Sequence, residues 1–488
     1  MTTVEQPRAT ARAVPPSQPT VVERLAEALE SAGVPYCQWK GHSKRHRWLT
    51  GTGDLDLLVD RAAWPALVEV LIGLGFKRAV PPAWLHLPGV TSYLAYERAT
   101  GRLVHVHAYH QLVIGLPWRT ILTPPLATAV LAGATRGFVV RAPAPHHELL
   151  LVVLQAAQRS TLRDMFLPRR AVWIKPVRRE LQRLEPRVEW TDLVTTLEEE
   201  LPSLPARVFE NCLDAYLTHA PAWRRYLLGR AVLRGLRPFA HRPSLTAVLT
   251  ALAWRIARAV GWSPPVEGKG LVGGGRVIAL VGGDGAGKTT CATELVGWLG
   301  AEIATLRVHL GKPPRSLLTL LAAAALKLGR FHAGLADHLE LLWCVCTARD
   351  RHRLYRRAWR FAGCGGVVIA ERYPIPENYA LCGPSDAQGI ATGLDTRLAR
   401  MLRRVETRFY TSMRPADATV VLLLPPELAV RRKTDEPEAY VRARATIVWE
   451  TDWANVNSGD GAGAHIIDAG RALPEVLSAL KSFVWSLI

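Results

Sequence analysis

A short apolar run followed by a glycine-rich loop constrains the fold of this chain more than any other feature. The run 277–281 leads into residues 282–290, Gly-Gly-Asp-Gly-Ala-Gly-Lys-Thr-Thr, which match the spacing G-x-x-x-x-G-K-[ST] of a phosphate-binding loop. Behind the loop, apolar residues recur at helical spacing until Gly300. This order predicts a strand, a loop and a helix whose N-terminus holds the phosphates of a nucleotide.

We expect the loop to bind ATP together with Mg²⁺. Its glycines let backbone N–H groups approach the phosphates, Lys288 adds a positive charge, and Thr289 offers a hydroxyl group to the metal ion. The expected nucleotide-binding residues are Gly282, Gly283, Asp284, Gly285, Ala286, Gly287, Lys288, Thr289 and Thr290. A glycine-rich turn that matches the spacing by chance is the alternative.

The patterning along the 488 residues predicts an α/β chain of several units. Polar, proline-containing residues 1–19 predict a disordered tail, and strands alternating with helices over 20–140 predict a small α+β domain. A helical pattern follows over 141–262 as an extension of that domain. The glycine-rich stretch 263–275 predicts a linker, and 276–488 predicts a domain with a parallel sheet.

Charge and cysteine content narrow the expected partners and location. A formal net charge of +19 indicates an anionic partner, yet no dense run of basic residues with interleaved aromatics occurs, so we do not expect nucleic acid. Seven cysteines without a C-x-x-C pair indicate neither a disulfide framework nor a zinc knuckle and favour the reducing cytoplasm. The apolar stretches 317–326 and 246–262 are too short or too interrupted for a transmembrane segment.

Two carboxylates in the N-terminal region form a second candidate site. Asp54 and Asp56 are two residues apart in an apolar strand pattern and therefore face the same side, where they can hold Mg²⁺. Upstream, residues 40–43 read Lys-Gly-His-Ser, a glycine turn followed by a hydroxyl group. This order resembles the nucleotidyltransferases of the DNA polymerase beta superfamily, and most of all a group of uncharacterised bacterial nucleotidyltransferase-like proteins, over roughly 20–250.

The resemblance departs from the superfamily at the strand 103–107. Its catalysts carry a third carboxylate on the neighbouring strand, where this chain has His105 and His107. Neutral imidazole suits Zn²⁺ or Mn²⁺ better than Mg²⁺, so we expect this domain to bind substrate or to regulate, in an inactive or altered form. Two readings stay open: ordinary packing of both histidines, and a bifunctional chain whose N-terminal domain transfers nucleotides.

Several strand ends in the C-terminal region carry charged residues. The buried strand pattern 366–370 leads to Glu371, Arg372 and Tyr373 at the sheet edge where ligands bind in open α/β folds. Two further strand patterns, 419–424 and 465–469, continue the alternation of strands and helices.

These residues resemble the thymidylate kinase family over nearly all of 276–488. That family carries G-x-D-G-x-G-K-T-T at its loop, an A-x-R helix segment and a D-R-Y strand end. The counterparts here are residues 349–351, which read Arg-Asp-Arg with arginine in place of the family's alanine, and residues 371–373. The resemblance implies the fold of a nucleoside monophosphate kinase. It also implies a phosphotransferase that moves the γ-phosphoryl group of ATP to a nucleotide or to another phosphorylated small molecule.

The resemblance implies a role for each matching residue. Because Gly285 stands where some members keep a loop arginine, the arginine over the transferred group is expected from a lid, at Arg431, Arg432, Arg442 or Arg444. The implied catalytic residues are Lys288, Glu371, Arg372, Arg431 and Arg432. The implied acceptor-binding residues are Asp284, Arg351, Arg372 and Tyr373, and the implied metal-binding residues are Thr289 and Glu371, with Asp54 and Asp56 in the N-terminal domain.

The departures from the thymidylate kinase pattern gather on the acceptor side. Thr347 stands where the family stacks a phenylalanine on thymine, and residues 309–314 replace its arginine-proline-glycine loop. Glu371 also replaces an aspartate. We therefore expect an acceptor other than thymidylate. An ATP-driven switch or binding protein is the alternative to a kinase, and the sequence leaves a homodimer open as the assembly.

Overall fold

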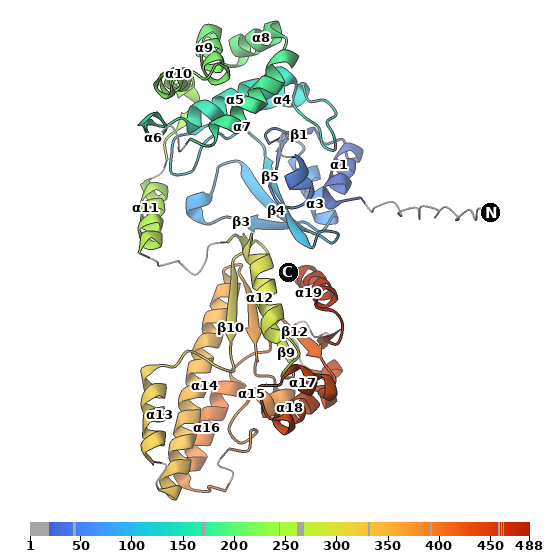
Figure 1. Ribbon diagram of the computed structural model, residues 1–488, viewed down its shortest axis with the longest axis vertical. Helices are drawn as coiled ribbons and strands as arrows, with labels where there is room; N and C mark the ends of the chain where they lie inside the picture. The colour runs from blue at the N-terminus through green and yellow to red at the C-terminus, as the bar shows by residue number, and fades with distance from the viewer. Residues whose placement is uncertain are drawn as a thin grey trace, which may run out of the picture.

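The structure is a computed structural model that describes residues 19–41, 45–166, 171–243, 245–260, 268–329, 332–390, 393–456, 459, 461 and 463–488. An N-terminal half built around a mixed sheet is stacked on a C-terminal half built around a parallel sheet (Figure 1). The predicted tail lies outside the described residues except for Pro19, and so do His42 and Ser43 of the predicted glycine turn.

The N-terminal half contains a six-stranded sheet with helices on both faces. Thr20 caps the first helix by accepting a hydrogen bond from the Glu23 N–H, and its own N–H donates to the Glu23 carboxylate. Strand β2 runs parallel to β5, and the other strand pairs are antiparallel. The strand order is β1 (Tyr36–Gln38), β2 (Leu55–Val59), β5 (Arg102–Tyr109), β4 (Val90–Glu97), β3 (Lys77–Val80) and β8 (Gly270–Leu271).

Apolar side chains bury both faces of this sheet. On one face, α1 (Val21–Ser31) and α3 (Trp64–Gly73) pack leucines against the strands. On the other face, Leu58 and Tyr109 join the apolar core of the helical region. That region comprises α4 (Ala127–Ala132), α5 (Pro145–Arg159), α6 (Leu162–Phe166), α7 (Ile174–Leu184), α8 (Trp190–Glu200), α9 (Ala206–Leu217), α10 (Ala222–Gly235) and α11 (Leu245–Ala259). The short elements of this half are α2 (Arg45–Leu49), β6 (Ile121–Leu122) and β7 (Ala240–His241).

The C-terminal half is a five-stranded sheet in which every pair is parallel, which confirms the mixed α/β fold expected from the sequence. The order is β10 (Thr305–His309), β11 (Val367–Glu371), β9 (Val277–Gly282), β12 (Ala418–Leu423) and β13 (Ala464–Asp468). Both faces are covered by helices, as a parallel sheet requires. These are α12 (Lys288–Gly300), α13 (Leu317–Gly329), α14 (Ala333–Gly363), α15 (Tyr379–Cys382), α16 (Arg397–Thr411), α17 (Pro426–Arg432), α18 (Glu438–Glu450) and α19 (Leu473–Leu487).

The stretch 263–275, which its glycines predict to be a linker, is ordered in its described part. Its first five residues lie outside the described chain, whereas Gly270 and Leu271 form β8 and pair with β3. A Cβ atom at Gly275 would lie 1.7 Å from the carbonyl oxygen of Gly366, so glycine is required here for close backbone contact. The amino-acid composition of this stretch does not show whether its glycines serve close backbone packing or a flexible linker.

The two halves share an apolar core as well as a strand pair. The rings of Tyr96, from β4, and Trp298, from α12, are 5.3 Å apart in an edge-to-face arrangement. Leu94 and Leu103 of the N-terminal sheet are buried in the same cluster as Leu295 and Leu299. The halves therefore pack against each other as well as being joined by the chain.

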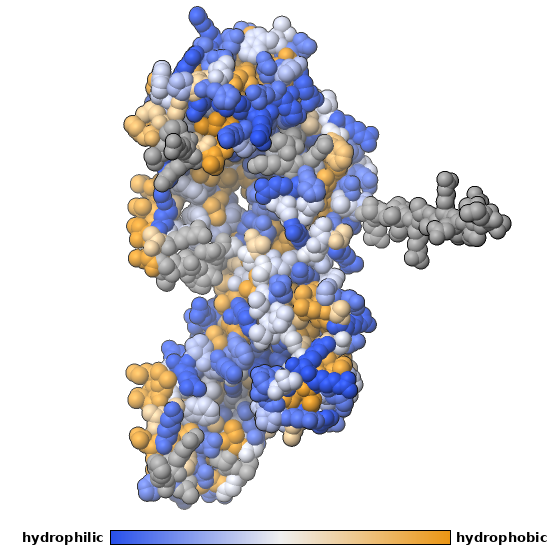
Figure 2. All heavy atoms as spheres, in the orientation of Figure 1, coloured by the Kyte–Doolittle hydropathy of each residue, from blue (hydrophilic) through white to orange (hydrophobic). Residues whose placement is uncertain are grey.

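Two helices present apolar side chains on the outside of the molecule. Leu249 and Leu252 of α11 are exposed, as are Leu317 and Leu321 of α13. Figure 2 shows these surfaces along one edge, over the positions of both helices in Figure 1. Among the helices that the structure describes, none has the length and apolar character needed to cross a bilayer.

Candidate functional site

The glycine-rich loop connects β9 to α12 in the conformation that its glycines permit. Gly285 and Gly287 have φ angles of 84° and 83°, in the left-handed region that favours glycine. Gly287 caps α12, and a Cβ atom at Gly285 would lie 2.9 Å from the Ala429 carbonyl oxygen. The loop therefore ends at a helix N-terminus, where partial positive charge and free N–H groups suit phosphate oxygens.

Lys288 is buried at this helix N-terminus. Its ammonium group donates a hydrogen bond of 2.6 Å to the carbonyl oxygen of Gly283. Burial, together with the nearby charge of Arg372, lowers the pKa of Lys288 to about 8. The side chain is thus held inside the loop, where it is still mostly protonated at pH 7 but loses its proton more readily than an exposed lysine.

Thr289 and Glu371, the two residues expected to hold Mg²⁺ here, lie together. The Thr289 hydroxyl donates to the Glu371 carboxylate over 3.1 Å, across the packing of α12 on β11. The other Glu371 oxygen accepts a hydrogen bond of 2.6 Å from Arg307 of β10. A hydroxyl and a carboxylate beside a phosphate-binding loop form an oxygen donor set that fits Mg²⁺.

Asp284 of the loop is held between two arginines. Its Oδ1 lies 2.7 Å from the Arg372 guanidinium, and its Oδ2 lies 3.1 Å from Arg444 of α18. Arg372 has a φ angle of 53°, a left-handed conformation that is uncommon for a residue other than glycine. The ion pair with Asp284 is one contact that holds this conformation.

The four candidate lid arginines lie in different places. Only Arg444 has a described contact with the loop. Arg432 donates to the Ala469 carbonyl oxygen over 2.9 Å, Arg442 pairs with Glu438 over 2.7 Å, and Arg431 is exposed. The expected roles of Arg431 and Arg432 in catalysis therefore stay predictions, and the geometry favours Arg444 instead.

Two adjoining cavities of about 350 Å³ and about 520 Å³ extend from the loop. The larger one is lined by Asp284, Arg372 and Arg444, and the other by a more apolar set that includes Trp343, Thr347 and Tyr410. Residues that line both are Gly311, Lys312, Arg351 and Gln388. A charged compartment beside the loop and a less polar one beyond it can hold the phosphate and the remainder of one acceptor.

Arg351, one of the residues predicted to bind the acceptor, lies at the junction of the two cavities. Its Nε donates to the Leu310 carbonyl oxygen over 2.6 Å, and its guanidinium lies 5.2 Å from the ring centre of Tyr410. Thr347 lies one helical turn before it, and within the described chain its buried hydroxyl group makes no hydrogen bond. Burial raises the pKa of Glu406, which accepts two hydrogen bonds from Ser385 in the same cavity wall.

Tyr373 is placed differently from the other expected acceptor-binding residues. It is buried in the core of the C-terminal half, where its hydroxyl donates to the Arg414 carbonyl oxygen over 2.7 Å and accepts from Trp359. Burial raises its pKa. The side chain lines neither of these two cavities and packs the end of the strand.

Several residues of the site were not expected from the sequence. Arg307 has no motif around it, although its place on a strand next to β11 could have indicated that it reaches Glu371. Trp343 stands four residues before Thr347 on the same helix, a spacing that could have marked it as a neighbour. Glu406 and Tyr410 come from α16, and no local pattern identifies them.

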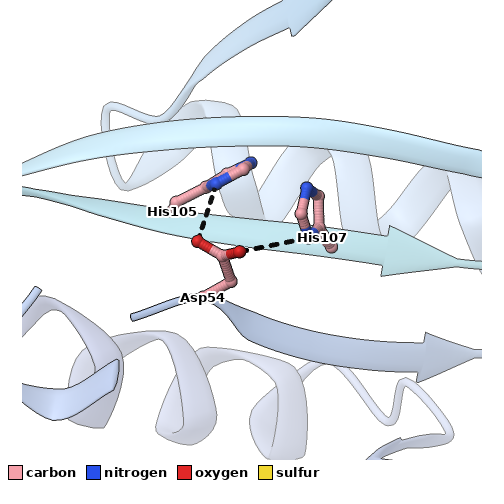
Figure 3. A group of neighbouring side chains, drawn as sticks. All are labelled: Asp54, His105 and His107. Atoms are coloured by element: carbon pink, nitrogen blue, oxygen red, sulfur yellow. Dashed lines mark hydrogen bonds and ion pairs between the residues drawn. The ribbon is translucent and has the colours of Figure 1, made fainter. Parts of the chain in front are cut away.

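The N-terminal carboxylates lie together with both histidines, as Figure 3 shows for three of the four side chains. His107 Nδ1 is 3.4 Å from Asp56 and 3.9 Å from Asp54. Asp56 also lies 3.1 Å from the Lys40 ammonium group and accepts a hydrogen bond of 3.0 Å from Tyr109. Burial opposes ionisation of Asp56, but the charge of Lys40 and the neighbouring His107 lower its pKa overall. Asp54, Asp56 and His107 face a cavity of about 600 Å³.

Comparison with known proteins supports a nucleotide-binding, kinase-like region. No protein-family model matches the chain. The uncharacterized ATP-binding protein YghS of Escherichia coli (strain K12) is 28% identical over 188 residues, which are 34% of this chain and 73% of that protein. Thymidylate kinase of Parasynechococcus marenigrum (strain WH8102) is 30% identical over 191 residues, which are 36% of this chain and 78% of that protein. Through this third of its length, the chain belongs to the thymidylate kinase family.

Proposed function

We propose that the chain is an ATP-dependent phosphotransferase whose acceptor is an anionic small molecule other than thymidylate. The observation that carries this proposal is the position of Arg372 and Arg444 on either side of Asp284, at the mouth of the phosphate-binding loop. Two guanidinium groups next to the loop can bind the acceptor phosphate and neutralise charge on the transferred group.

In the proposed reaction, an acceptor oxygen attacks the γ-phosphorus of ATP, and the bond to the β,γ-bridging oxygen breaks to release ADP. Lys288 and the N-terminus of α12 hold the phosphates of ATP. Mg²⁺ bound near Thr289 and Glu371 would neutralise negative charge on these phosphates. Arg351 and Tyr410 line the compartment for the remainder of the acceptor.

For the N-terminal domain, we propose a nucleotidyltransferase-like unit that binds a substrate or regulates the kinase. Its carboxylates face a large cavity, but the Lys40 ammonium group and the rings of His105 and His107 already contact them. This arrangement favours binding over two-metal nucleotidyl transfer, which needs hard oxygen ligands around Mg²⁺.

The proposal is tested by incubating the full chain with γ-labelled ATP and a small-molecule extract of cells, and by identifying what becomes labelled. We expect one labelled product whose formation matches the release of ADP. Slow release of ADP and phosphate at the same rate with and without the extract would instead support an ATP-driven switch.

A further inference from the structure

Asp54, His105 and His107 form a cluster that the proposed kinase chemistry does not use. One potential ligand atom from each residue lies within 4.8 Å of the others. Asp54 directly precedes β2, and both histidines face it from the adjacent strand β5. Figure 3 shows Asp54 between the two rings, with one carboxylate oxygen directed to each.

The C-terminal half contributes a further potential ligand to the cluster. Glu302 follows α12, and its Oε2 lies 3.3 Å from His105 Nδ1. Asp54 Oδ1 lies 3.0 Å from the same nitrogen atom. Nδ1 of a neutral imidazole can donate to only one of these carboxylates, whereas a metal ion bound to this nitrogen could contact both.

The separations between these atoms are close to those of a metal-binding shell. Four ligand atoms at about 2.0 to 2.1 Å from a tetrahedral Zn²⁺ lie about 3.3 to 3.4 Å from one another. The two carboxylate contacts of His105 Nδ1, at 3.0 and 3.3 Å, are close to this value, and the 3.9 Å from His107 Nδ1 to Asp54 is somewhat longer. Asp54, His105 and His107 already have ligand atoms within 4.8 Å of one another, whereas Glu302 contacts only His105 of these three and would have to move toward the other two residues to join the shell.

The donor set also selects the kind of metal. Imidazole nitrogens suit Zn²⁺ and other first-row transition metals, whereas Mg²⁺ prefers an all-oxygen shell. His105 is 4% exposed, so its ring is held in place by the fold before any ion arrives. Lys269 donates to Glu302 over 2.6 Å and fixes that carboxylate next to the cluster.

We propose that Asp54, His105 and His107 bind one transition-metal ion of the Zn²⁺ class, with Glu302 of the C-terminal half as the fourth ligand. The ion ties β2 and β5 to the end of α12, across the packing between the two halves. This site is independent of the proposed kinase reaction, because its residues are separate from the phosphate-binding loop and both acceptor cavities.

The test is calorimetric titration of the full chain, after treatment with a chelator, with ZnCl₂ and separately with MgCl₂. We expect one Zn²⁺ per chain, bound at least about tenfold more tightly than Mg²⁺. Asp54→Asn and His107→Gln should each weaken Zn²⁺ binding by about tenfold or more. Glu302→Gln should also weaken it, but the chain should still bind one Zn²⁺ ion through the other three ligands. The matched control is His110→Gln, whose ring packs on Trp64 and should bind Zn²⁺ like the wild type.

A second measurement uses the unaltered chain, so that it does not depend on the folding of any variant. Co²⁺ added to the metal-free chain should give the visible absorption of a tetrahedral site, and one equivalent of Zn²⁺ should remove it. Zn²⁺ should also raise the unfolding temperature, because the ion binds only the folded arrangement. The proposal is overturned if Zn²⁺ does not saturate in the micromolar range, if Mg²⁺ binds equally well, or if all three ligand variants bind Zn²⁺ like the wild type.

Discussion

The guanidinium group of Arg372 lies 2.7 Å from the carboxylate of Asp284, although 88 residues separate them in the chain. This ion pair joins the phosphate-binding loop to the end of β11 and accompanies the left-handed backbone of Arg372. Arg444 approaches the second oxygen of the same carboxylate from α18. In the absence of substrates, Asp284 therefore holds two guanidinium groups next to the loop, where the proposed reaction requires positive charge.

Replacing either arginine should impair the use of the acceptor more than the binding of ATP. We expect Arg372→Ala and Arg444→Ala each to lower kcat/KM for the acceptor by about 10- to 100-fold, because a charge-assisted hydrogen bond contributes about 1.5 to 3 kcal/mol. Steady-state kinetics with each substrate varied in turn will measure this. The control is Arg353→Ala on the exposed side of α14, and equal kinetics in all three variants would remove both arginines from the site.

Loss of the loop lysine should remove turnover. We expect Lys288→Ala to lower kcat by about 100- to 1,000-fold or more, because the transition-state charge on the phosphates loses its buried cation. Release of ADP under saturating ATP is the measurement, with Lys327→Ala on α13 as the control. Turnover within a few-fold of the wild type would contradict the assignment of the loop.

The affinity for ATP should fall as the pH rises above about 8. In the free protein, burial lowers the pKa of Lys288 to about 8, whereas bound phosphates favour its ammonium form and raise that pKa. At a pH between the pKa of Lys288 in the free protein and its higher pKa in the complex, ATP binding takes up a proton. Over this range the association constant for ATP should fall by up to about tenfold per pH unit. Calorimetry at a series of pH values will measure this.

Lys288→Arg provides the matched control for the pH dependence. Arginine stays protonated throughout this range, so its complex should lose the slope above about pH 8 even if its affinity is lower. A wild-type affinity that is constant up to about pH 9.5 would show that phosphate binding does not depend on the charge of Lys288.

Thymidylate should be a poor acceptor. Thr347 offers no aromatic ring for stacking, and loss of such a contact costs about 1 to 3 kcal/mol, or roughly a 5- to 150-fold effect. The loop 309–314 also lacks the arginine that the resemblance leads one to expect. The test is to measure ADP release with a panel of nucleoside monophosphates at equal concentrations. If thymidylate gave the highest kcat/KM, the prediction that the pocket disfavours it would be wrong.

The contact between the two halves should contribute measurably to stability. Trp298→Ala removes the edge-to-face contact with Tyr96 and part of the shared apolar core, and we expect a loss of about 1 to 3 kcal/mol in the free energy of unfolding. Urea unfolding followed by circular dichroism will measure it. Trp223, which is 55% exposed, provides the control Trp223→Ala, and an equal loss in the two variants would argue against a stabilising contact between the halves.

Local and periodic features of the fold could be predicted from the sequence. Three such features are the loop 282–290, the strand and helix on either side of it, and the helix cap at Thr20. Each depends on residues that are close together in the chain, so its pattern can be recognised in the sequence. The same holds for Asp54 and Asp56, because alternation along a strand places them on one face.

Other features depend on contacts that no local pattern records. The glycines of 263–275 predict a flexible linker, but β8 forms because β3 offers an unpaired edge at that point. Arg444, rather than Arg431 or Arg432, reaches Asp284 because α18 packs beside the loop. Glu302 meets His105 only because the two halves pack together.

The sequence by itself determined the glycine-rich loop, the alternating α/β pattern and the carboxylate pair of the N-terminal half, since each rests on the spacing of a few nearby residues. Tertiary structure alone decided which arginines face Asp284, which side chains line the two cavities near the loop and which carboxylates approach the histidines. The physical reason is that long side chains reach across several ångströms, so their partners are set by the packing of helices and strands that lie far apart in the chain.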